Sequence, residues 1–163
     1  LNKGAAQIIR SGNGISHSEK INAGGHMFQI WFDPNLNESI QQPASYDDYQ
    51  DEVFPLSEEN GIKTKVYRGE GSPLKMSSEG VEILEKLFTA GTHTINLDAG
   101  KLHSIYLVNG EAEVNGEQII KDDFLIVKEQ GELELNITDN AQLFVVSSLE
   151  KLSYRTYAET YAR

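Results

Sequence analysis

Cysteine is absent from this sequence of 163 residues. Its absence excludes disulfide bonds, metal sites built from thiolates and cysteine nucleophiles. Disulfides belong to oxidising compartments, so a chain without cysteine fits the reducing interior of the cell. We therefore expect a cytoplasmic protein.

Long apolar runs and an excess of positive charge are also missing. No stretch approaches the roughly 20 apolar residues that span a bilayer, and no basic region followed by an apolar one opens the sequence. Lys and Arg number 14 against 25 Asp and Glu, which gives a formal net charge of -11. Such a chain repels phosphate groups, so we expect neither nucleic acid nor a membrane as partner.

The length allows one domain, or one domain plus part of another. The first residue is Leu1, and residues 5–10 already have the composition of a strand. Because the sequence opens inside an element, we expect a fragment, a processed product or a trimmed record.

Short apolar runs separated by Gly, Asn and Asp dominate the pattern. Residues 27–33 predict a strand that ends at Pro34. Residues 35–60 keep no hydrophobic period and predict a long connection. Further strands are predicted at 63–68, 81–87, 92–97, 104–108, 111–114, 124–127, 133–137 and 142–146.

Turn signals support an all-β architecture. The pairs Asn109-Gly110 and Asn115-Gly116 predict tight turns. Strands of this length at regular spacing indicate a sandwich or a barrel. At the end of the sequence, residues 153–163 predict a terminal helix. Branched side chains of the second half would fill the interior between two packed sheets: Ile105, Leu107, Phe124, Ile126, Leu133, Leu135, Leu143, Val145 and Val146.

The segment Ser-Gly-Asn-Gly-Ile-Ser-His-Ser-Glu, residues 11–19, carries the clearest chemical signal. It places the imidazole of His17 and the carboxylate of Glu19 two positions apart, just after a glycine-bracketed turn. On an extended strand these side chains would point to the same face. One nitrogen and one oxygen ligand make half of a metal site of the kind that suits iron, nickel or copper. The alternative interpretation is a histidine and a glutamate paired on the surface.

The same segment resembles the Gly-x-Gly-Ile-x-His-Ser-Glu signature of the pirin family, whose members consist of two cupin barrels. Residues 28–31, Phe-Gln-Ile-Trp, are similar to the family's Gln-Leu-Trp strand. Pro43 followed by Tyr49-Gln50 is similar to its Pro-x-Tyr-Gln region, and Gly69-Glu70-Gly71-Ser72-Pro73 falls at its Gly-Ser-rich turn. The resemblance is specific over residues 1–75 and general over residues 76–150.

The resemblance implies an all-β fold of the cupin type, a double-stranded β-barrel or jelly roll, with the first barrel incomplete. Residues 1–50 would be terminal strands of an N-terminal cupin with a linker, and residues 51–163 the C-terminal cupin barrel. A second copy or another chain would cover the sheet edge left open in the first barrel.

The resemblance also implies an iron-dependent dioxygenase that acts on a small aromatic substrate, a flavonol such as quercetin. In the family, two histidines of an earlier His-x-His segment hold Fe(II) together with the histidine and the glutamate of the His-Ser-Glu motif. His17 and Glu19 match this second pair. The first pair has no counterpart here, so we expect impaired activity and weak or no iron binding in this chain. The alternative is a non-catalytic binding or regulatory module.

Other candidate residues have structural interpretations. His26 is predicted to be a polar loop residue, and His103 a structural residue of a second barrel that holds no metal. Glu111 and Glu113 are predicted to be solvated hairpin positions. Aromatic residues at 28 and 31 are predicted to lie in the core or to stack on a ligand.

Overall fold

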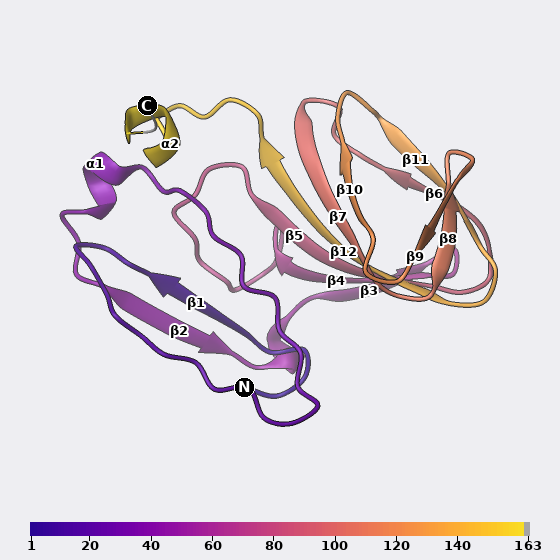
Figure 1. Ribbon diagram of the computed structural model, residues 1–163, viewed down its shortest axis with the longest axis horizontal. Helices are drawn as coiled ribbons and strands as arrows, with labels where there is room; N and C mark the ends of the chain where they lie inside the picture. Colours follow the sequence, from indigo (N-terminus) through magenta and orange to yellow (C-terminus); the bar gives the residue numbers. More distant parts are fainter. Residues whose placement is uncertain (162–163) are drawn as a thin grey trace.

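The computed structural model describes residues 1–161. Ten strands form a barrel of two antiparallel sheets (Figure 1). The six-stranded sheet has the order β10-β7-β12-β5-β4-β3, and the four-stranded sheet the order β6-β11-β8-β9. The bounds are β3 Leu56–Glu59, β4 Ile62–Arg68, β5 Glu82–Phe88, β6 Gly91–Asn96, β7 Lys101–Asn109, β8 Glu111–Val114, β9 Glu117–Ile120, β10 Phe124–Val127, β11 Glu132–Ile137 and β12 Ala141–Leu149.

Alternating apolar residues fill the space between the two sheets. Leu107, Leu135 and Leu143 have no exposed surface, and they lie in one continuous cluster with most of the interior predicted from the sequence. The core prediction is wrong for three residues: Val146, which is only partly buried on β12 between the buried Val145 and Ser147, and Phe124 and Ile126 on β10. Phe124 and Ile126 point outward and are 57% and 60% exposed, while their neighbours Leu125 and Val127 pack against the core. All four residues are apolar, so the pattern alone left open which pair faces inward.

A two-stranded sheet lies outside the barrel (Figure 1). The strand β1, Ala6–Arg10, pairs with β2, Ser45–Tyr49. Arg10 reaches Asp47 at 2.7 Å, and the Gln7 amide donates to Asp48 at 2.6 Å. Cross-strand polar contacts therefore hold this pair, and β2 needs no hydrophobic period.

The predicted long connection over residues 35–60 is wrong. It contains β2, β3, the short helix α1 (Leu36–Ser39) and a 3-10 turn, η1 (Asp51–Val53). These elements are short, and most of their residues are exposed, so their side chains carry little of the periodicity on which a sequence-based prediction depends.

The predicted strand over residues 27–33 is also wrong. No strand ladder includes these residues, because no neighbouring edge in the described chain pairs with their backbone. Their aromatic side chains pack without sheet pairing: the ring of Phe28 lies parallel to that of Phe144 at 4.6 Å.

The turn and helix predictions have mixed outcomes. Asn115-Gly116 joins β8 to β9 as a two-residue hairpin turn, with both residues at positive φ. Asn109-Gly110 instead carries the chain from one sheet to the other, since β7 and β8 lie in different sheets. The helix α2 spans Tyr157–Tyr161, and positions 162–163 of the predicted helix lie outside the described residues. Within residues 1–161, neither helix has the length and apolar character needed to cross a membrane.

Candidate metal centre

The glycine-bracketed turn before the His-Ser-Glu segment is fixed by close backbone contacts. Gly12 has a φ of 51°, and a Cβ at this position would meet the backbone of Gln42 and Pro43. The Asn13 amide donates to the Gln42 carbonyl at 2.9 Å, and the Gly14 amide donates to the Ser11 carbonyl at 2.8 Å. Only glycine allows this approach without strain, so the signature glycine fixes where the chain leaves β1.

His17 and Glu19 lie close together, as the spacing predicted. Their Nε2 and Oε1 atoms are 3.9 Å apart. Their closeness does not come from a strand, because residues 15–21 pair with no neighbour. Both side chains are about one-third exposed, which leaves their ligand atoms open to solvent.

The two groups fit one metal ion in type and in spacing. Metal bonds to imidazole nitrogen and carboxylate oxygen are each about 2.1 Å long, so two of them span about 4.2 Å. This exceeds the observed separation, and one ion can therefore contact both atoms. Among residues 1–161, no group of three or more His, Cys, Asp or Glu side chains lies close enough to hold a metal. The described residues thus offer two candidate ligand atoms here, fewer than the three or four of a usual metal site.

Both side chains line an open cleft of about 1970 Å³. One side is the irregular segment that follows β1, and the other is the outer face of the six-stranded sheet. The volume is larger than the roughly 300–1000 Å³ of a fitted small-molecule pocket, so the cleft is an open surface. Trp31 also lines it and is 85% exposed, which makes the core prediction for this residue wrong.

Aromatic rings cover the sheet side of this cleft. Phe28 packs edge-on against Tyr106 at 5.2 Å in addition to its stacking on Phe144. Tyr67 lies 6.0 Å from Phe144. Of these four aromatic residues, the sequence singled out only Phe28 as a candidate for ligand stacking. Tyr67, Tyr106 and Phe144 come from strands that only the sheet topology brings together.

A charged cluster lies beside these rings and was missed by the sequence reasoning. Lys65 forms ion pairs with Asp51 and with Glu85, the latter at 3.7 Å, and its Nζ lies 5.6 Å from the ring centre of Tyr67. Burial, and then the nearby Glu85 and Asp51 carboxylates, raise the pKa of Tyr67 well above its usual value of 10.0. The phenol therefore stays protonated at neutral pH. Lys65 and Glu85 face each other in the register of β4 and β5, which no local motif reveals.

The histidines of the barrel have structural contacts. The ring of His103 is buried, with Nδ1 2.8 Å from Ser147 Oγ and Nε2 2.9 Å from the Asp98 carbonyl oxygen. Nε2 of His93 lies 2.8 Å from the Thr89 carbonyl oxygen. Both ring nitrogens of His103 are thus occupied within the protein, in agreement with the predicted structural role. His26, Glu111 and Glu113 are exposed, as predicted for loop and hairpin positions.

Comparison with known proteins gives structural matches only. No family model matches the chain, and no curated protein matches it. A crystal structure of quercetin 2,3-dioxygenase from Acinetobacter baumannii matches with a TM-score of 0.62 and 19% identity, over 78% of this chain and 49% of that one. A second crystal structure of quercetin 2,3-dioxygenase from this bacterium matches with a TM-score of 0.61 and 18% identity, over 69% of this chain and 39% of that one. The crystal structure of a protein from Geobacillus kaustophilus matches with a TM-score of 0.56 and 15% identity, over 69% of this chain and 50% of that one.

These likenesses establish the fold. This chain spans half the length, or less, of the solved structures that it resembles. At identities of 19% and below, structural similarity carries no substrate or activity across. The chain has the all-β fold of the cupin type, a double-stranded barrel, as the sequence predicted.

Proposed function

We propose that this chain is part of a pirin-like, iron-dependent dioxygenase that acts on flavonols such as quercetin. Residues 1–50 would be terminal strands of an N-terminal cupin with its linker, and residues 51–163 the C-terminal cupin barrel. The observation that carries the proposal is the 3.9 Å separation of His17 and Glu19 within the signature segment. The likeness of the fold to quercetin 2,3-dioxygenase supports it.

In this proposal His17 supplies an imidazole nitrogen and Glu19 a carboxylate oxygen, a donor set that suits Fe(II). When bound, Fe(II) would orient substrate and oxygen and act as a Lewis acid. The aromatic rings of the cleft offer stacking surfaces for a flat flavonol, with Trp31 the most exposed of them. Two ligands give poor affinity, so the proposal includes impaired activity for this chain alone.

The alternative is a non-catalytic cupin module that binds or regulates another molecule. It is favoured by the lack of a third candidate ligand near His17 and Glu19 in the described residues. The two proposals differ in whether further ligands are encoded ahead of Leu1.

The test compares this chain with a version lengthened by any residues that its coding sequence holds upstream. Where these include a His-x-His segment, we expect about one iron per lengthened chain, with quercetin and oxygen consumed together. His17→Ala should reduce the iron content to about a tenth or less, because even residues that only support metal ligands contribute about 10–100-fold to affinity. Elemental analysis, quercetin absorbance and oxygen uptake measure these outcomes.

The matched control is His26→Ala, which removes an exposed histidine that lines the same cleft. It should retain both iron and activity. A lengthened protein that carries a His-x-His segment but no iron would contradict the dioxygenase proposal. A coding sequence without such a segment would support the non-catalytic module.

A further inference from the structure

Residues 15–34, which we call the flap, have few attachments to the rest of the protein. Residues 15–31 are all exposed, and no residue of the flap belongs to a strand or a helix. The ring of Phe28 packs on Tyr106 and Phe144 of the six-stranded sheet. Within residues 1–161, the flap forms hydrogen bonds to other parts of the chain at Asp33 alone. Two contacts therefore hold the flap on the sheet: the packing of Phe28 and the bonds of Asp33.

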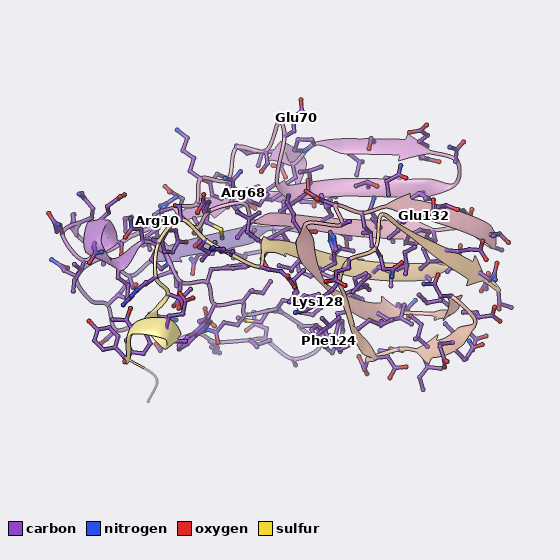
Figure 2. All side chains as sticks on the ribbon, turned by 90° about the horizontal axis from the view of Figure 1, so that it is seen from above. Arg10, Arg68, Glu70, Phe124, Lys128 and Glu132 are labelled. Carbon is purple, nitrogen blue, oxygen red and sulfur yellow. The ribbon has the colours of Figure 1, made fainter. Side chains whose placement is uncertain are left out.

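Both hydrogen bonds at Asp33 come from residues 150–161, which we call the tail. The Tyr154 hydroxyl donates to the Asp33 carbonyl oxygen at 2.8 Å, and the Tyr157 amide donates to the Asp33 carboxylate at 2.9 Å. The partners are 121 and 124 residues apart in the sequence. Figure 2 shows the tail (yellow) leaving the barrel toward the end of the molecule that holds α1, as in Figure 1. The tail thus fixes a segment that is distant in sequence.

The tail is anchored to the barrel just before β5. The Ser153 amide donates to the Glu79 carboxylate at 2.8 Å, and the Glu79 amide donates to the Tyr154 hydroxyl at 3.4 Å. Gly80 packs against Leu149 at the end of β12, where a Cβ at position 80 would overlap the Leu149 side chain. One oxygen atom, that of the Tyr154 hydroxyl, therefore joins the barrel to the flap. It accepts from Glu79 and donates to Asp33.

The start of α2 holds the second donor in place. The Glu159 amide donates to the Thr156 hydroxyl at 3.2 Å, and the Thr156 amide donates to the Glu159 carboxylate at 2.8 Å. This reciprocal pair is a capping box, which satisfies two amides at the beginning of a helix. The Tyr157 amide lies in the first turn, where the helix itself offers no acceptor, so it donates to Asp33.

We propose that the tail is a latch that keeps the flap closed over the aromatic face of the six-stranded sheet. When the two bonds at Asp33 break, Phe28 alone holds the flap, and a segment with so few buried contacts opens readily. Departure of Phe28 then uncovers the rings of Tyr106 and Phe144 in the cleft. The latch thus controls access to the cleft. Its contacts involve neither His17 nor Glu19, so the proposal is independent of the metal site.

Two residues of the flap report its opening. Trp31 is the only tryptophan in the sequence, and Lys20 is the only trypsin site between residues 15 and 34. Tyr154→Phe keeps the ring and removes the hydroxyl that donates to Asp33. We expect trypsin to cut this variant after Lys20 about fivefold faster, the factor by which a hydrogen bond of ordinary net strength shifts an equilibrium. The fluorescence anisotropy of Trp31 should fall, because the indole moves more freely in the open flap.

A second variant, Asp33→Ala, removes the acceptor of the Tyr157 amide and should change both measurements in the same direction. The matched control is Tyr161→Phe, which removes a hydroxyl from an exposed residue of the same tail and should behave as the unmodified chain. Mass spectrometry identifies the bond that is cut, and circular dichroism checks that each variant keeps the fold. Cleavage and anisotropy that stay unchanged in both Tyr154→Phe and Asp33→Ala would overturn the proposal. Changes of equal size in Tyr161→Phe would also overturn it.

Discussion

Leu143→Ala should lower the free energy of unfolding by about 3–4 kcal/mol. Leu143 has no exposed surface and lies on β12, the strand between β7 and β5. Its side chain packs in the cluster between the two sheets, opposite Leu107 in the register with β7. Truncation removes contacts and leaves a cavity that strands bonded on both sides are unable to close.

Chemical denaturation of the two proteins measures this loss, and the melting temperature should fall by roughly 6–16 °C. Leu87→Ala is the matched control, because Leu87 lies on β5 with 39% of its surface exposed. It should cost about 1 kcal/mol or less. Equal losses at the two positions would contradict the location of the core.

His103→Ala should lower the free energy of unfolding by about 2–4 kcal/mol and leave metal binding at residues 17 and 19 unchanged. The Asp98 carbonyl is only an acceptor, so Nε2 of the neutral ring carries the proton, and Nδ1 accepts from the Ser147 hydroxyl. Removing the ring leaves a cavity and deprives the buried Ser147 of its partner.

Denaturation in urea, combined with a metal titration of the same variant, separates a structural histidine from a ligand. His26→Ala removes an exposed histidine and should change stability by about 0.5 kcal/mol or less. Loss of metal binding in His103→Ala, with stability unchanged, would show that the barrel holds its own metal site.

The barrel was predictable because its strands alternate. The residues Ile105, Leu107, Leu133, Leu135 and Leu143 recur with period two, and all of them are buried. In β10 four consecutive apolar residues remove that signal, so the exposure of Phe124 and Ile126 emerged only from the pairing with β7. The four-residue strand β9 was missed, although the turn at Asn115-Gly116 requires a second strand after it.

The candidate site was predictable only in part. The spacing in the signature segment brought His17 and Glu19 together, and the glycine at position 12 fixed the turn before them. The segment forms no strand, since a strand needs a partner edge and pattern alone supplies none. The cluster around Lys65 depends on contacts with Asp51 and Glu85, which are distant in sequence, and no local motif encodes them.

Paramagnetic broadening of backbone NMR signals by Mn²⁺ tests most directly whether His17 and Glu19 hold a metal. A weakly bound ion still broadens nearby resonances, so the method suits a site with two ligands. We expect broadening centred on residues 17 and 19, lost in His17→Ala and retained in His26→Ala. Broadening centred elsewhere, or unchanged in His17→Ala, would contradict the metal site and the iron chemistry proposed from it.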